Sequence, residues 1–270
     1  MCGIVGFVGK QGDKEQVLDD MMKVIVHRGP DSAGKYVNDQ VALGFRRLSI
    51  IDLENGSQPM FNEDGEVGIV FNGEIYNSPE LRERFQAKGH VFKNSSDTET
   101  LVHGYEEYGE KLVHELRGMF GFAIWDNKKK RLFMARDFFG IKPIYYAMVH
   151  GNLVFGSEIK SILEFPGFKK EVNNEALEEY LSFQYSNLKE TFFKGVYRLL
   201  PGHYLTYQNG ELNVTQYFDP TLEPVSKDSQ EELVKKLSDV LEDSVEKHML
   251  ADVEVGAFLS SGVDSSYIAA

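Results

Sequence analysis

Short apolar runs dominate the middle of the chain and predict β-strands. Four such runs are separated by turns with Asp-Asn-Lys or His-Gly-Asn sequences, and they indicate successive antiparallel hairpins. They cover residues 120–125, 131–134, 144–146 and 153–155. Further apolar stretches predict strands over 2–8, 41–45, 67–71, 203–208 and 212–217.

Apolar residues spaced three or four positions apart predict helices between these strands. The first such pattern runs from Val17 to Ile25, and the second from Leu101 to Tyr108. Ser78 followed by Pro79 is typical of a helix start, and Gly89 of a helix end. Short helices are predicted near 158–164 and 174–182.

The composition changes after Phe218. Residues 219–230 hold prolines and charges and are predicted to be a linker between a first domain, 1–218, and the beginning of a second one, 231–270. Ser229 and Glu232 form a capping-box pattern for a helix that reaches about Met249. The apolar run 253–259 then predicts a strand. Because a lone strand cannot form a sheet, we expect the chain to be a piece of a longer protein.

Composition and charge narrow the class of protein. The chain has 270 residues, 42% hydrophobic content and a formal net charge of −13, which excludes a disordered polymer and a disulfide scaffold. The negative charge argues against nucleic acid as the main partner. No apolar stretch reaches the ~18 residues of a membrane helix, and no signal peptide is visible. A single cysteine favours a reducing cytoplasm.

That cysteine, Cys2, directly follows the initiator Met1. Removal of Met1 would place a free α-amino group, a base near neutral pH, beside the thiol. A thiol with an adjacent base is an activated nucleophile. The alternative is that Cys2 is a small apolar residue opening a strand, and taken alone this is the better interpretation.

Four other segments carry residues suited to chemistry. They are His27-Arg-Gly-Pro-Asp31, Phe45-Arg-Arg-Leu-Ser-Ile-Ile51, Phe71-Asn-Gly-Glu-Ile-Tyr-Asn77 and Ser95-Ser-Asp-Thr-Glu99. Each alone also has an ordinary explanation, such as a turn at Asn72-Gly73 or a helix cap at Asp97. The histidines His90, His103 and His248 show no metal-ligand spacing, so the sequence predicts no metal site and treats them as surface or core residues.

Together with Cys2, these segments resemble class II glutamine amidotransferases, which are N-terminal nucleophile hydrolases. Within that class the resemblance is greatest to the glutamine-dependent asparagine synthetases. It covers nearly the whole chain. It implies an α+β fold: a four-layer αββα sandwich with two antiparallel sheets, followed by the start of a parallel α/β domain of the ATP-pyrophosphatase type.

The resemblance also implies roles for individual residues. Cys2 would attack the side-chain amide of glutamine, form a thioester and release ammonia, and water would then yield glutamate. Asn72 and Gly73 would supply the oxyanion donors. Arg47 would hold the α-carboxylate, because a guanidinium fork suits bidentate contact, and Asp97 the α-ammonium group. Glu74, Ile50 and Ile51 would line the same pocket, and the loop from His27 to Asp31 would support it.

Residues 259–265 resemble the pyrophosphate loop of ATP pyrophosphatases, in which backbone N–H groups before a helix cradle phosphate. The loop comprises Leu259, Ser260, Ser261, Gly262, Val263, Asp264 and Ser265. Ser261 stands where glycine is more usual, so we expect weaker ATP binding if that position needs a positive φ. The ordinary explanation is a simple strand-to-helix turn.

The resemblance predicts an asparagine synthetase that uses glutamine, aspartate and ATP with Mg²⁺, while the glutaminase half needs no cofactor. We expect this chain alone to be a glutaminase that makes no asparagine. A related enzyme acting on a different carboxylate acceptor stays open, as does a non-catalytic glutamine-binding module. A homodimer is a further open alternative.

Overall fold

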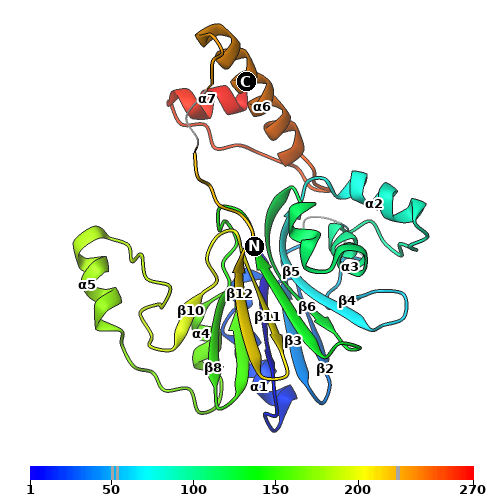
Figure 1. Ribbon diagram of the computed structural model, residues 1–270, viewed down its shortest axis with the longest axis vertical. Helices are drawn as coiled ribbons and strands as arrows, with labels where there is room; N and C mark the ends of the chain where they lie inside the picture. The colour runs from blue at the N-terminus through cyan, green and yellow to red at the C-terminus, as the bar shows by residue number, and fades with distance from the viewer. Residues whose placement is uncertain (50–51, 53–54, 223–225) are drawn as a thin grey trace.

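Two antiparallel six-stranded sheets form the centre of the protein (Figure 1). The computed structural model describes residues 1–49, 52, 55–222 and 226–270. In the first sheet the order is β10-β8-β9-β1-β3-β2, with β1 Gly3–Val8, β2 Ser32–Val37, β3 Val41–Arg47, β8 Tyr145–Val149, β9 Asn152–Gly156 and β10 Val196–Arg198. In the second it is β12-β11-β7-β6-β5-β4, with β4 Met60–Phe61, β5 Val67–Ile75, β6 Gly118–Asp126, β7 Arg131–Arg136, β11 His203–Gln208 and β12 Glu211–Gln216.

The helices lie outside the sheets. They are α1 Lys14–Lys23, α2 Ser78–Ala87, α3 Asp97–Tyr108, α4 Ile159–Leu163, α5 Asn174–Phe183, α6 Gln230–His248 and α7 Val263–Ala269, with 3₁₀ turns η1 Val26–Arg28 and η2 Gly109–His114. In the described part of the chain, none of them combines the length and apolarity that a membrane crossing needs. Helix α2 begins one residue earlier than a cap at Ser78 with Pro79 as the first helical residue predicts, because Asn77 occupies the N-cap position and Ser78 is already helical.

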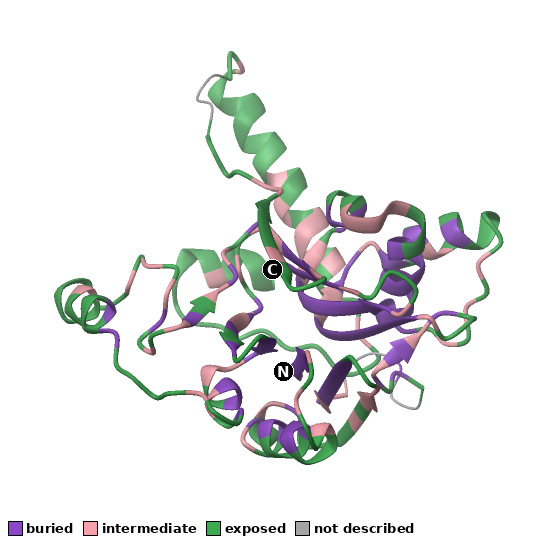
Figure 2. Ribbon diagram, turned by 60° about the horizontal axis from the view of Figure 1, so that its bottom comes forward, coloured by how far each residue is buried: buried purple, intermediate pink, exposed green. Residues whose placement is uncertain are grey.

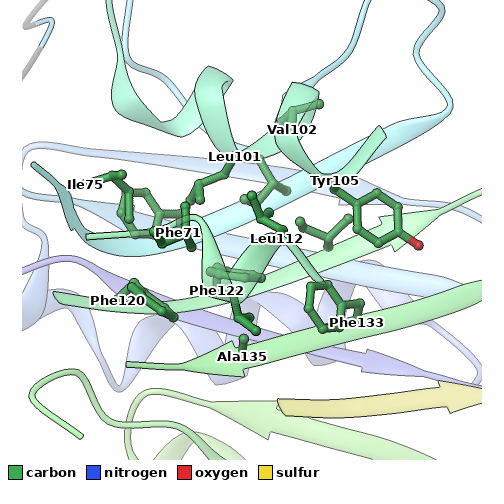
Figure 3. Close-up of a cluster of buried hydrophobic side chains, with 14 of the residues drawn as sticks. Phe71, Ile75, Leu101, Val102, Tyr105, Leu112, Phe120, Phe122, Phe133 and Ala135 are labelled. Atoms are coloured by element: carbon green, nitrogen blue, oxygen red, sulfur yellow. The ribbon is translucent and has the colours of Figure 1, made fainter. Parts of the chain in front are cut away.

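Three buried apolar clusters separate four layers, which confirms the predicted αββα sandwich. One cluster packs α3 and η2 against the second sheet, as Figure 3 shows for Leu101, Tyr105 and Phe122. The middle cluster fills the space between the sheets and includes Ile4 and Val70. The third joins α1 and α4 to the outer face of the first sheet. The strands facing the middle cluster are therefore buried on both faces.

The predicted run of hairpins is divided between the two sheets. β6 and β7 pair in one, while β8 and β9 pair in the other. The segment between β7 and β8 crosses from one sheet to the other and is organised by Asp137, which is 1% exposed. Its carboxylate accepts hydrogen bonds from the backbone N–H groups of Phe120, Ile141 and Lys142. A buried carboxylate with several N–H donors fixes such a loop without sheet pairing.

Helix α6 leaves the sandwich and projects away from it (Figure 1), and much of its surface is exposed (Figure 2). The predicted capping box of Ser229 and Glu232 is present at its start. Its other end touches the sandwich, where Lys247 Nζ lies 2.8 Å from Glu80 Oε1 and the His248 ring lies 4.3 Å from the ring of Tyr76.

The predicted strand over 253–259 is wrong. These residues are exposed and irregular, and no described strand pairs with them. A strand needs a neighbouring strand to satisfy its backbone N–H and C=O groups, and the apolar run alone cannot provide one. The helix predicted after it exists as α7.

Candidate active site

Cys2 lies immediately before β1 and is partly buried against the apolar layer between the two sheets. Its Sγ atom lies 3.4 Å from both the carbonyl oxygen and the backbone nitrogen of Leu48. Burial raises the pKa of the thiol, while the Leu48 hydrogen bond and nearby positive charges act in the opposite direction. The thiol is therefore held at a fixed place beside the end of β3.

The loop from His27 to Asp31 supports this arrangement. Arg28 donates from Nε to the carbonyl oxygen of Cys2 at 2.9 Å, and its Nη1 pairs with Glu158 at 3.2 Å. Asp31 accepts the backbone N–H of Ser49 at 2.8 Å and donates its own N–H to the carbonyl of Arg47. The loop thus ties the start of β1 to the end of β3.

Arg47 is the last residue of β3 and is only 6% exposed. Side chains alternate across a strand, so Arg47 shares a face with Leu43 and Phe45, which belong to the cluster between the sheets. Its Nη2 donates to the carbonyl oxygen of Asp52 at 2.5 Å. Asp52 is in turn held by Ser95, whose backbone N–H and hydroxyl both donate to Oδ2.

Asn72, Gly73 and Glu74 are consecutive residues of β5 in the facing sheet. Val70 belongs to the cluster between the sheets, so by alternation Asn72 and Glu74 are on that same face, toward Cys2. The Nδ2 atom of Asn72 is buried and has no hydrogen-bond partner among the described residues. An unused buried N–H donor is costly, and such donors serve to stabilise oxyanions.

Gly73 has a structural reason to be glycine that sequence reasoning missed. A Cβ atom there would lie 2.1 Å from the carbonyl oxygen of Met119 on β6. The absence of a side chain is therefore required by the close approach of the neighbouring strand, in addition to any role toward a ligand.

Asp97 begins α3, and Ser96 caps that helix by accepting the N–H of Thr98. One carboxylate oxygen of Asp97 accepts the N–H of Ile75 at 2.9 Å. Burial raises the pKa of Asp97 to about 7, and the nearby Glu74 adds to that increase. Burial also raises the pKa of Glu74. A positively charged partner would therefore stabilise the ionised form of both carboxyls.

One pocket brings most of these residues together, and its lining comes from five separate segments. It is lined by Cys2, Phe45, Arg47, Leu48, Gly56, Gln58, Phe71, Gly73, Glu74, Ser96, Asp97 and Thr98. Asn72 is not on its surface but lies in the strand beneath it. The predicted pocket residues Ile50 and Ile51 lie outside the described residues.

Sequence reasoning missed two buried residues at this site. Gln58 is 8% exposed, and its side-chain amide bonds to both the N–H and the carbonyl of Phe71, which holds the pocket wall against β5. Lys142 is 6% exposed, and burial lowers its pKa, while its charge acts on Cys2 and Glu74. Neither residue lies in a recognisable motif, because their importance comes from contacts across the fold.

Met1 is present in the structure and is 57% exposed. Burial of its α-amino group lowers the pKa of that group, and the charges of Arg28 and Lys142 lower it further. Lys142 Nζ lies 3.5 Å from Met1 Sδ.

The predicted phosphate loop is largely exposed and leads into α7, which Figure 1 shows beside α6 and away from the sandwich, and none of its residues lines this pocket. Ser265 Oγ donates to the carbonyl of Ser260 at 2.8 Å, and Gly262 caps α7. Ser261 is not among the described residues with positive φ, so the backbone reason for weaker ATP binding is absent.

The site combines a thiol, the unpartnered amide donor of the adjoining Asn72, a buried guanidinium, the buried carboxyl of Asp97 and the partly buried carboxyl of Glu74. This set can attack a carbonyl carbon, stabilise an oxyanion and pair with both charges of an amino acid. Fold and site together define an amidotransferase of the N-terminal nucleophile hydrolase type. The chain belongs to the glutamine amidotransferase domain family, whose sequence pattern matches residues 1–218. A second pattern, that of asparagine synthase, matches residues 236–270.

Curated relatives and solved structures agree with this placement. The chain is 44% identical to "Asparagine synthetase [glutamine-hydrolyzing] 1" of Bacillus subtilis over 99% of the chain and 43% of that protein. It is 38% identical to "Amidase chyE" of Penicillium rubens over 100% of the chain and 42% of that protein. The chain thus spans less than half the length of either relative. Glutamine phosphoribosylpyrophosphate amidotransferase from B. subtilis shares the fold, with a TM-score of 0.59 and 18% identity over 80% of this chain and 49% of that one.

Proposed function

We propose that the chain is the glutamine-hydrolysing part of an asparagine synthetase. The observation that carries the proposal is the convergence of Cys2, Arg47 and Asp97, from three distant segments, on one pocket. The 44% identity to a relative named as a glutamine-hydrolysing asparagine synthetase supports the choice of protein within the family.

Glutamine would bind through its two charges. Arg47 would pair with the α-carboxylate in a bidentate contact, and Asp97 and Glu74 would face the α-ammonium group. An ammonium ion between them would offset the cost of keeping the buried Asp97 and the partly buried Glu74 both ionised. A simple amide has neither charge and would make neither ionic contact, so the site would select glutamine.

Removal of Met1 would leave the α-amino group on Cys2 itself. That amine would take the thiol proton as sulfur attacks the amide carbon of glutamine. The amide oxygen would become an oxyanion, stabilised by Asn72 Nδ2 and the backbone N–H of Gly73. The C–N bond would then break, and the protonated nitrogen would leave as ammonia. Water would attack the thioester through a second oxyanion, releasing glutamate and the free thiol.

In the whole protein, aspartate and ATP would form an aspartyl-adenylate and pyrophosphate. Ammonia would displace AMP to give asparagine. The loop from Leu259 to Ser265 fits a phosphate ligand in its chemistry, because it offers serine hydroxyls and backbone donors, with Asp264 as a carboxylate for Mg²⁺. The exposed apolar residues of α6, among them Leu233 and Leu237, also suit a helix that packs against further protein.

The relative named as an amidase favours a second candidate, in which the same glutaminase serves a different acceptor. Both candidates share the chemistry of the first domain. The single thiol suits a reducing cytoplasm, which we propose as the location. A homodimer is not needed for the pocket, since one chain supplies all the residues named above.

The test measures glutamate release from glutamine by the purified chain, after mass spectrometry has established that Cys2 is the first residue. We expect activity that is lost in Cys2→Ala and strongly reduced in Cys2→Ser. A chain that retains Met1 serves as a matched control and should be inactive. Equal activity in Cys2→Ala would overturn the proposal. Asparagine formed by the 270-residue chain from aspartate, MgATP and ammonia would contradict the assignment of this part as glutaminase only.

A further inference from the structure

Four side chains from three separate segments of the chain meet beside α3. They are Glu63, which follows β4, His90, which follows α2, and His103 and Glu106 of α3. One potential ligand atom from each lies within 4.8 Å of all the others. None of these residues lines the glutamine pocket.

The distances between donor atoms match a tetrahedral metal. His103 Nδ1 lies 3.1 Å from Glu106 Oε2 and 3.6 Å from Glu63 Oε2. His90 Nδ1 lies 3.7 Å from Glu106 Oε2 and 3.8 Å from Glu63 Oε1. Ligands bound to zinc at about 2.0–2.1 Å and tetrahedral angles lie roughly 3.3 Å apart. The four potential ligand atoms lie within 4.8 Å of one another, so the side chains must contract onto an ion, with Glu63 contributing one of its two oxygens.

The groups around the cluster already hold each potential ligand in place. His90 has its other nitrogen, Nε2, 3.0 Å from Glu107 Oε1, the carboxylate–histidine contact typical of metal sites. Asn62 donates to the free oxygen of Glu106 at 2.6 Å. Val91 donates its N–H to Glu63 at 2.9 Å. These contacts leave His90 Nδ1 and one oxygen of each glutamate directed at the centre of the cluster.

His103 is the most buried of the four side chains. It is only 1% exposed, and Nε2 has no hydrogen-bond partner in the described ranges. The carboxylate of Glu99 lies 3.9 Å from Nε2, and the ring of Phe92 packs on the imidazole at 4.5 Å. Nδ1, the nitrogen that faces the cluster, already lies 3.1 Å from Glu106 Oε2, so a bound metal would take the place of this contact.

We propose that Glu63, His90, His103 and Glu106 bind one Zn²⁺ ion. Two neutral imidazoles and two carboxylates suit zinc, and the two negative charges balance those of the ion. Four protein ligands leave no open position, so the site is structural. It ties the segment after β4, the loop after α2 and helix α3 together, and α3 carries Asp97 at its first position. The proposal is independent of the glutaminase assignment.

The experiment uses the 270-residue chain carrying Cys2→Ala, so that the thiol does not compete for metal. After chelator treatment, Zn²⁺ is titrated against a chromophoric chelator, and bound zinc is counted by mass spectrometry of the metal. We expect one zinc per chain with a Kd below about 1 μM, and a rise in Tm on zinc addition. Substitution with Co²⁺ should give the intense visible absorption of a four-coordinate site.

Matched variants locate the ion. His90→Gln and Glu106→Gln should each weaken zinc binding at least ~100-fold and abolish the rise in Tm. Glu83→Gln and His203→Gln make the same chemical changes elsewhere on the surface and should leave binding unchanged. His103 is left intact because of its burial, and circular dichroism checks that every variant is folded.

Three outcomes would overturn the proposal. The chain could bind no zinc in the titration, which would identify the cluster as a network of polar contacts without a metal. The ligand variants could bind as tightly as the controls, which would place the ion elsewhere. A preference for Mn²⁺ over Zn²⁺ would contradict the tetrahedral assignment.

Discussion

Arg28 donates a hydrogen bond from its guanidinium to the backbone carbonyl of Cys2, 26 residues earlier in the chain, at 2.9 Å. The same side chain pairs with Glu158 on the segment that follows β9. The guanidinium of Arg28 therefore helps to fix the position of the proposed nucleophile through its backbone carbonyl and not through its sulfur atom. Arg28 is a positioning residue.

We expect Arg28→Ala to lower kcat for glutamine hydrolysis about 10–100-fold with little change in KM. The reason is that a hydrogen bond from a charged group contributes about 1.5–3 kcal/mol, here to the placement of Cys2. His27→Ala is the matched control, because His27 also contacts Glu158 but is largely exposed. An equal loss in both variants would show that Glu158, not the contact with Cys2, matters. Steady-state kinetics with glutamine separates the two cases.

Substitution of Arg47 by lysine keeps the charge and removes the planar fork. We expect Arg47→Lys to raise KM for glutamine at least ~10-fold, because a lysine cannot make the bidentate contact with a carboxylate. The control is Arg46→Lys, since Arg46 is the neighbouring residue on the opposite face of β3. An unchanged KM in Arg47→Lys would remove Arg47 from the proposed carboxylate site.

Asn72 offers a test that separates catalysis from stability. Because Nδ2 of Asn72 has no partner in the described chain, its loss removes no hydrogen bond of the folded protein through that atom. We expect Asn72→Ala to lower kcat about 10²–10³-fold, as removal of an oxyanion donor does, while the free energy of unfolding changes by no more than about 1 kcal/mol. A kcat within a factor of about two of the parent would contradict the oxyanion role. Urea titration monitors the stability in parallel.

The buried carboxyl of Asp97 links stability to pH. Its pKa is raised from 3.8 to about 7 in the fold, chiefly by burial. Between these two values the folded state holds more protons than the unfolded chain, so stability falls as the pH rises through this window. Three pKa units correspond to up to about 4 kcal/mol.

Asp97→Asn should therefore stabilise the protein at about pH 8, by up to about 4 kcal/mol, and have little effect near pH 4. The same variant should bind glutamine poorly, because a neutral amide cannot pair with the ammonium group. In the parent protein, KM should rise as the pH drops below about 7. Denaturant titrations of both proteins at the two pH values decide the matter, and a destabilised variant at about pH 8 would refute the burial argument.

Local pattern was enough to predict most of the secondary structure. Strands β1, β5, β6, β7, β9 and β11 and helices α1, α3 and α6 arise from apolar periodicity and end signals close to the residues themselves. The prediction failed over 253–259, where the residues have the apolarity of a strand but no neighbouring strand to pair with. It also could not place β7 and β8 in different sheets, because the crossing depends on how Asp137 organises the segment between them.

The amino-acid sequence by itself determined the residue types of the glutamine pocket, since Cys2, Arg47, Asn72, Gly73 and Asp97 are in motifs that resemble a known family. Only the tertiary structure decided how they meet: β1 and β3 come from one sheet, β5 from the other, and α3 contributes Asp97. Contacts that are distant in sequence carry no local pattern. For that reason Gln58, Lys142 and the cluster of Glu63, His90, His103 and Glu106 became visible only in the fold, where packing of the two sheets and their helices sets distances that spacing along the chain cannot.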